Sequence, residues 1–140
     1  MKRKLHSQSG FTLIEVMIVV IIIGALAAFV GPELFGRVSQ TRTTVAENQI
    51  KIFEVALNNY RLDNGSYPAD LEALIEQPND ASDWAGPYID ANKIPKDPWG
   101  NEYHYRAEGE NNKHKFDLWS EGRDNSPGGS GEDADVTNWE

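Results

Sequence analysis

Three residues near the start of the chain have types and a spacing that could support chemistry. Gly10 and Phe11 precede a long apolar run, and Glu15 lies a few residues inside that run. A carboxylate at the centre of a membrane-spanning helix costs about 2.5–3.5 kcal/mol even on lenient scales. Glu15 therefore implies a compensating gain. An opposite charge close by would supply it, because two such groups neutralise each other where neither is tolerable alone.

A second group of candidate residues lies in a glycine-rich, acidic stretch near the C-terminus. Three carboxylates, with backbone carbonyls to assist them, could converge if this stretch folds back on itself. They belong to Asp124, Asp133 and Asp135, with the carbonyls near Glu121 and Ser126. Oxygen ligands suit Ca²⁺, and the stretch offers no nitrogen or sulfur ligand for zinc. The spacing is not that of an EF-hand, and composition by itself is more typical of a disordered tail.

Composition excludes several other classes of function. The chain of 140 residues has no cysteine, and so no disulfide framework, thiolate metal site or cysteine nucleophile. Its formal net charge of −9 repels phosphate backbones, so we expect no nucleic-acid partner. No serine–histidine arrangement and no catalytic carboxylate pair stands out, so we expect no enzyme.

Histidines and tryptophans are weaker candidates. His104 and His114 lie on two expected strands, where they could be cross-strand neighbours but are more simply ordinary strand residues. Trp99, Trp119 and Trp139 could form a carbohydrate platform, although core packing and anchoring of the C-terminus explain them better.

A long helix is expected to carry the N-terminal candidates. Residues 11–31 form an apolar run that is long enough to span a bilayer at about 1.5 Å per residue. Three basic residues precede this run, which predicts a cytoplasmic N-terminus and an exported body. Beyond Gly31-Pro32 the apolar residues recur at a helical period. We therefore expect one helix over about residues 11–62, with a single apolar face in its second half.

Short elements are expected to follow the helix. The turn residues "DNGSYP" (residues 63–68) end it, and residues 69–77 predict a short amphipathic helix. "DPWG" (residues 97–100) fits a tight turn. Alternating apolar and polar residues predict two strands, 102–107 and 114–120, joined by a hairpin loop.

The start of the chain resembles a known processing signal. The basic leader, Gly10, Phe11 and the position of Glu15 are similar to the class III signal of type IV pilins and pseudopilins. The resemblance implies that a prepilin peptidase cleaves between Gly10 and Phe11 and methylates the new amino terminus. It also implies that Glu15 pairs with the amino terminus of a neighbour in a filament of packed N-terminal helices. The residues themselves leave a pair within one subunit open.

Four later segments resemble the major pseudopilins, the G subunits, of type II secretion systems. They are "LDNGSYP", "DPWGNEYHY", "FDLWSEGRD" and "GEDADVTNW". Type IV pilins usually have a disulfide-closed loop instead, which a chain without cysteine cannot form. The resemblance implies a type IV pilin-like α+β fold. In it, a long N-terminal helix, transmembrane in its first half, packs on a small antiparallel β-sheet with a C-terminal loop. The resemblance also implies that this loop binds Ca²⁺ through the ligands named above.

The same resemblance implies an organisation and a function. The expected parts are a cleaved leader (1–10), a transmembrane and filament-core helix (11–31) and a periplasmic domain (32–140). The chain would be a structural subunit of a periplasmic pseudopilus, assembled from the bacterial inner membrane, that drives export of folded proteins across the outer membrane. Its partners would be further copies in a helical homopolymer, minor pseudopilins, the inner-membrane assembly platform, the prepilin peptidase, and membrane lipid before assembly. A type IV pilin of an adhesive or twitching pilus, and a membrane-anchored periplasmic binding module, are the alternatives.

Overall fold

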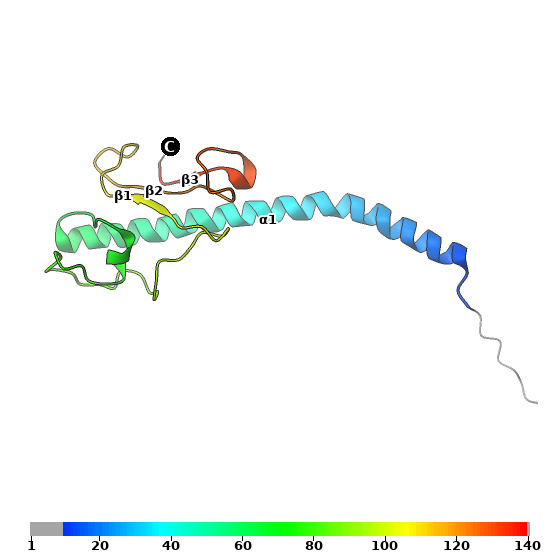
Figure 1. The fold of residues 1–140 in the computed structure, drawn as a ribbon, viewed down its shortest axis with the longest axis horizontal. Helices are drawn as coiled ribbons and strands as arrows, with labels where there is room; N and C mark the ends of the chain where they lie inside the picture. The colour runs from blue at the N-terminus through cyan, green and yellow to red at the C-terminus, as the bar shows by residue number, and fades with distance from the viewer. Residues whose placement is uncertain (1–9, 140) are drawn as a thin grey trace, which may run out of the picture. The chain divides into compact units, whose positions relative to one another are not determined.

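One long helix and several short elements make up the fold (Figure 1). A computed structural model describes residues 10–139, without the side chains of residues 30–35. The elements in this range are α1 (Leu13–Asn64), η1 (Leu71–Leu74), β1 (His104–Arg106), β2 (Asp117–Ser120), η2 (Gly131–Asp133) and β3 (Val136–Thr137). The expected fold class, a long N-terminal helix with a small antiparallel sheet, is confirmed.

Helix α1 is continuous through Gly31-Pro32, and its bounds lie within two residues of those predicted. It ends where Gly65 adopts a φ of 81° and donates its N–H to the Arg61 carbonyl at 2.8 Å. Glycine favours this position because a side chain would strain the left-handed conformation. The helix therefore ends at the turn that the sequence predicted, and the left-handed conformation of Gly65 is the physical reason.

The chain divides into two compact units, one up to Arg37 and one from Val38 onward. The expected boundary between residues 31 and 32 stays a prediction, and residues 1–9 of the expected leader lie outside the described residues. No helix within residues 10–139 combines the length and the apolar character that a membrane span requires.

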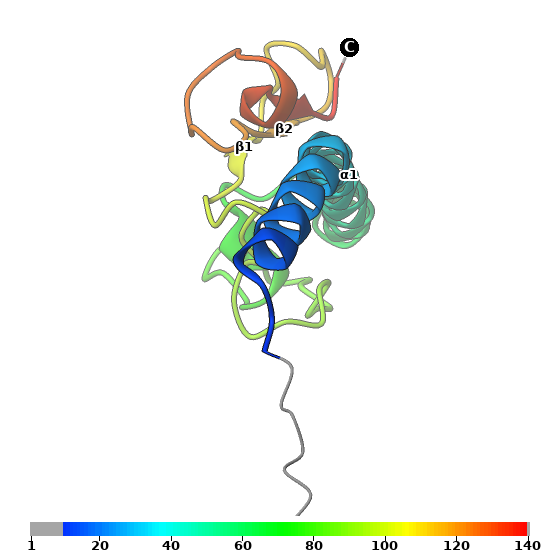
Figure 2. The same ribbon diagram turned by 90° about the vertical axis from the view of Figure 1, so that its right-hand side faces the viewer.

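The core of the second unit is built on one face of α1. Side chains three or four residues apart are buried on this face, as the helical period predicted. They are Ala46, Ile50, Phe53, Ala56, Leu57 and Tyr60. Leu74 from η1, Phe116 and Leu118 from the β2 region, and Val136 from β3 pack in the same cluster. Viewed along α1, the loops and the sheet cover one side of its second half, residues 38–64, and leave the other side of that half open (Figure 2).

The sheet has the order β1-β2-β3 with antiparallel pairs. Its inner face carries Leu118, and its outer face carries a row in which Trp119 pairs with both His104 and Thr137. The two expected strands are confirmed, in shorter form. Strand β3 has only two residues, too few to give an alternating pattern, so the sequence did not predict it.

The short helix expected over residues 69–77 is a 3₁₀ turn, η1. Asp70 starts it by accepting a hydrogen bond from the Ala73 N–H at 3.2 Å. Leu71 and Leu74 are buried, and Ile75 is partly exposed. A single turn suffices to bury both residues, so the packing does not require a longer helix.

Candidate functional site

The predicted cleavage bond lies just before α1, at a point that the fold does not cover. Gly10 and Phe11 are both exposed, and the Phe11 side chain has 91% of its surface accessible. A peptidase could therefore reach this bond without unfolding any packed part of the described chain.

Thr12 and Glu15 form a reciprocal cap at the start of α1. The Thr12 N–H and hydroxyl both donate to Glu15 Oε2, at 2.8 and 3.0 Å, and the Glu15 N–H donates to Thr12 Oγ1 at 3.3 Å. This is a capping box, in which the two residues satisfy backbone donors that a helix leaves unpaired. Sequence reasoning missed it, although threonine followed three residues later by glutamate is its signature.

An uncovered apolar surface follows this cap. Every large apolar side chain from Phe11 to Phe29 is at least half exposed, and these side chains lie on all sides of the helix. Such a surface is unusual on a soluble monomer and marks a place that lipid or other protein covers.

The C-terminal acidic loop, residues 121–135, brings its two ends together. The Arg123 N–H donates to the Glu132 carbonyl at 2.8 Å. Gly122 has a φ of 66°, and a Cβ atom there would come within 2.7 Å of the Glu132 carbonyl oxygen. Both the conformation and the contact require glycine, so this residue allows the loop to close.

A buried polar network around Asp97 holds the start of this loop. The Asp97 carboxylate is 5% exposed and accepts hydrogen bonds from the Ser120 hydroxyl at 2.6 Å and from the Trp99 and Asn101 N–H groups. The Gly122 N–H donates to Ser120 Oγ at 3.2 Å, and Asn101 Nδ2 donates to the Gly122 carbonyl at 2.8 Å. Both backbone groups of Gly122 are thus fixed by the "DPWGN" turn and by the end of β2.

The predicted calcium ligands have separate local partners. Asp124 Oδ1 accepts from the Ser126 N–H at 3.2 Å, and Asp135 Oδ2 accepts from the Gly128 N–H at 3.0 Å. Within residues 10–139, no group of three or more acidic or histidine side chains is placed to hold a metal ion. The donors are oxygens of the kind that Ca²⁺ takes, but their arrangement here does not gather them.

The third predicted ligand, Asp133, is occupied by a cation of the chain itself. Arg123 Nε donates to Asp133 Oδ1 at 2.9 Å, Nη2 donates to Oδ2 at 3.0 Å, and Nη1 donates to Glu132 Oε2 at 3.1 Å. The hydrogen bond and the charge of Asp133 raise the pKa of Arg123 above its ordinary value. Sequence reasoning assigned no role to Arg123, although an arginine between Glu121 and Asp124 was a visible signal.

A second buried carboxylate, Asp117, organises the connection between β1 and β2. Asp117 Oδ2 accepts from the Glu110 and Asn111 N–H groups, both at 2.9 Å, and Oδ1 accepts from the Asn112 N–H at 2.8 Å. Burial raises the pKa of Asp117, but these backbone donors outweigh it and leave the pKa below its ordinary value. Asp117 is completely buried, although it alternates with the apolar residues Phe116 and Leu118 along the strand.

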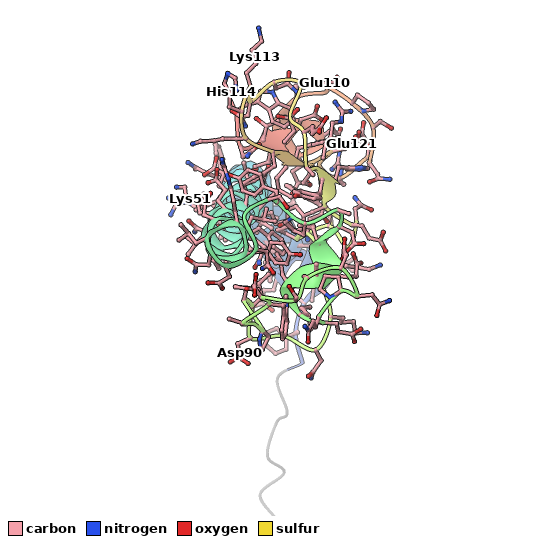
Figure 3. The ribbon with its side chains drawn as sticks, turned by 90° about the vertical axis from the view of Figure 1, so that its left-hand side faces the viewer. Lys51, Asp90, Glu110, Lys113, His114 and Glu121 are labelled. Atoms are coloured by element: carbon pink, nitrogen blue, oxygen red, sulfur yellow. The ribbon has the colours of Figure 1, made fainter. Side chains whose placement is uncertain are left out.

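The histidines do not form a cross-strand pair. His104 pairs with Trp119 on β2, while His114 lies in the β1–β2 connection with a φ of 74°. Figure 3 shows Glu110, Lys113 and His114 together at the outer end of that connection. No catalytic role is assigned to either histidine.

The three tryptophans do not make a flat carbohydrate platform. His104 stacks on the Trp119 ring, with centroids 5.2 Å apart, and the Arg106 guanidinium lies 5.8 Å from the same ring. Trp139 meets Trp119 by its edge at 5.6 Å. Trp99 is partly buried and packs against the core. These ring contacts favour a role in packing over one in carbohydrate binding. The edge contact between Trp119 and Trp139 also holds the C-terminus.

Comparison with known proteins assigns this architecture to a family. A family profile described as "Type II secretion system (T2SS), protein G" matches residues 33–139, and one described as "Prokaryotic N-terminal methylation motif" matches residues 5–31. The chain belongs to the protein G family of type II secretion systems. It is therefore a major pseudopilin, a structural subunit rather than an enzyme, as the sequence predicted.

Individual relatives agree with this family along nearly the whole chain. Type II secretion system core protein G of Pseudomonas aeruginosa is 47% identical, over 96% of this chain and 97% of the relative. That of Vibrio cholerae is 42% identical, over 98% and 95%. The crystal structure of the major pseudopilin from the type 2 secretion system of enterohaemorrhagic Escherichia coli matches with a TM-score of 0.63 and 29% identity. That match covers 77% of this chain and 95% of the other.

The methylation motif also gives the coarse location and the first partners. A pseudopilin with this motif belongs to the inner membrane and periplasm, and a pseudopilus subunit has copies of itself and the secretion machinery as partners. The motif implies processing by a prepilin peptidase. Its residues 5–31 include Gly10, Phe11 and Glu15.

Proposed function

We propose that this pseudopilin is cleaved between Gly10 and Phe11, methylated on Phe11, and assembled through its N-terminal helix into a helical homopolymer. Before assembly, the subunit lies in the inner membrane with a cytoplasmic N-terminus and a periplasmic body. Growth of the filament pushes folded proteins through an outer-membrane channel, and a separate cytoplasmic motor supplies the energy.

The observation that carries this proposal is the apolar surface from Phe11 to Phe29, which no part of the described chain covers. Lipid covers it before assembly, and neighbouring N-terminal helices cover it afterwards. Because the apolar side chains surround the helix, several neighbours can pack on it at once, as a filament requires. Minor pseudopilins and the inner-membrane assembly platform would make the first contacts of this kind.

Glu15 is proposed to set the axial position of one subunit against the next. Cleavage creates an ammonium group on Phe11, and a carboxylate next to an ammonium is tolerated in hydrocarbon where either alone is not. In the structure, Thr12 of the same chain donates to Oε2 of Glu15. A neighbour's amino terminus would reach the carboxylate through Oε1 while the cap stays in place.

Ca²⁺ binding by the acidic loop is a further part of the proposal. Asp124, Asp133 and Asp135 would supply carboxylates, and Glu121 and Ser126 would supply backbone carbonyls. These acidic groups repel one another when they come close together, and the ion would offset this repulsion. Because the described arrangement leaves these groups apart, binding requires the loop to rearrange.

The proposal is tested by replacing the resident major pseudopilin of a type II secretion system with this chain. We expect a mature subunit that begins with N-methylphenylalanine, filaments that contain it, and restored release of folded proteins. Processed filaments without restored release would contradict the proposed role in export. A subunit that keeps Met1 would contradict the proposed cleavage, and a processed subunit that forms no filament would contradict the proposed assembly.

A further inference from the structure

Arg123 occupies the place in the acidic loop where carboxylates are concentrated. Its guanidinium holds both oxygens of Asp133 in a fork, at 2.9 and 3.0 Å, and also reaches Glu132 at 3.1 Å. A fork of two parallel bonds fixes the position of both partners better than a single ion pair does. Both carboxylate oxygens of Asp133 are therefore already in contact with Arg123.

Glu132 connects this pair to helix α1. Its Oε1 lies 3.5 Å from Arg42 Nη1, while its Oε2 accepts from Arg123. The Glu132 side chain is only 17% exposed, so water screens these contacts less than it screens an ordinary surface pair. The chain of charges Arg42–Glu132–Arg123–Asp133 joins η2 to the helix, and Figure 1 shows η2 beside α1.

The backbone supports the same closure. The Arg123 N–H donates to the Glu132 carbonyl at 2.8 Å, and Gly122 lies against the backbone of residues 132–134. Arg123 thus stands at the point where the two ends of the loop meet, and its side chain and its backbone both hold the far end.

We propose that Arg123 is the internal cation of this loop: it closes the loop without metal, and it competes with Ca²⁺ for Asp133. The inference rests on the calcium proposal above. A calcium ion at Asp133 would lie beside the guanidinium that already binds both oxygens, and two cations at this distance repel each other, so the ion binds better once the guanidinium has left. Arg123 therefore sets the affinity of the loop for divalent cations.

The test uses the full-length chain in detergent micelles. Calcium binding is measured by isothermal titration calorimetry, and thermal melting is followed in the presence of chelator. R123Q removes the guanidinium, and R123K keeps the charge but loses the fork. R106Q is the matched control, because Arg106 forms an exposed ion pair with Glu110 at 2.7 Å in another part of the unit.

We expect R123Q to bind Ca²⁺ about tenfold more tightly than wild type, since one competing charge has gone. In chelator, R123Q should melt about 2–5 °C below wild type, because the side-chain bonds that help to close the loop are then lost and only the backbone contacts remain. R123K should lie between the two in both measurements, and R106Q should match the wild-type affinity.

Equal calcium affinity in wild type and R123Q would overturn the competition. Unchanged melting of R123Q in chelator would overturn the closure, and an equal gain of affinity in R106Q would assign the effect to net charge. If neither protein bound Ca²⁺ at about 10 mM, well above the range of extracellular modules, the calcium proposal would fail together with the competition. Binding in both proteins with equal affinity would remove only the role of Arg123.

Discussion

Thr12 and Glu15 hold each other across the first turn of α1, with the Thr12 N–H 2.8 Å from Glu15 Oε2 and the Glu15 N–H 3.3 Å from Thr12 Oγ1. The cap and the proposed filament pair use the same carboxylate for different reasons. The cap requires only an oxygen that accepts hydrogen bonds, whereas the pair with an ammonium requires a negative charge.

Glutamine at position 15 separates these two roles, since a capping box accepts glutamine as well as glutamate. We expect Glu15→Gln to be cleaved after Gly10 and to keep the start of α1, but to form no filaments. Glu15→Val should also be cleaved, should fail to assemble, and should be retained more strongly in the membrane. Mass spectrometry of the mature subunit and electron microscopy of sheared filaments check both variants. Filaments of normal yield from Glu15→Gln would show that hydrogen bonding suffices and that no ion pair is needed.

Gly10 precedes the cleavage bond, and a peptidase that accepts only glycine there should reject a larger side chain. We expect Gly10→Val to insert in the membrane, keep its leader and stop assembly. Gly24→Val is the matched control: it makes the same change inside α1, where a new Cβ has nothing within 4 Å apart from its chain neighbours and the backbone of the helix itself. Intact mass measurement reports the result. Loss of the leader from Gly10→Val would refute the assignment.

The parts of the fold that sequence reasoning predicted are those with a local signal. The period of apolar residues gave the buried face of α1, and the glycine after Asn64 gave its end. Alternation gave the inward residues of β1 and β2, such as Leu118. Each of these depends on neighbours within a few positions, so one sequence suffices to predict them.

The parts that it did not predict depend on contacts between distant residues. Strand β3 forms only because β2 offers a free edge, and Asp117 is buried only because a loop wraps its backbone donors around it. Arg123 meets Asp133 ten positions away after the loop has closed. The composition of residues 121–135 indicates a flexible, acidic stretch. It does not indicate that an arginine orders this stretch.

Calcium should raise the melting temperature of the full-length chain in micelles if the loop binds it. Binding stabilises the folded state by RT ln(1 + [L]/Kd), about 2.7 kcal/mol at a hundredfold excess over Kd. We expect the rise in millimolar calcium to disappear with chelator and to be absent in Asp124→Ala and Asp135→Ala. Asp90→Ala, an exposed aspartate outside the loop, should keep the full rise. Identical wild-type melting with calcium and with chelator would refute the site.

Asp117 should be among the most sensitive polar residues for stability. Asparagine there replaces one carboxylate oxygen by an N–H group, which faces a backbone donor of Asn111 or Asn112 and leaves it unsatisfied. Such a loss costs about 1–3 kcal/mol, and each kcal/mol lowers the melting temperature of a small domain by about 4–8 °C. Thermal melting at pH 7 compares Asp117→Asn with Asp90→Asn, whose aspartate is exposed. Equal melting of these two variants would contradict the role of Asp117.

The effect of Asp117→Asn should also depend on pH. Burial raises the pKa of Asp117, but the backbone donors of Asn111, Asn112 and Glu110 lower it by more. The folded-state pKa therefore lies below the unfolded value of about 3.9. The carboxylate therefore adds stability that is fully present well above pH 4. As pH falls towards the folded-state pKa, the unfolded chain takes up the proton first, and this stability is lost. Melting curves from pH 7 down to pH 3 should show that the difference in melting temperature between wild type and Asp117→Asn shrinks below about pH 4. A difference that stays constant across this range would mean that the ionised carboxylate is not what the loop binds.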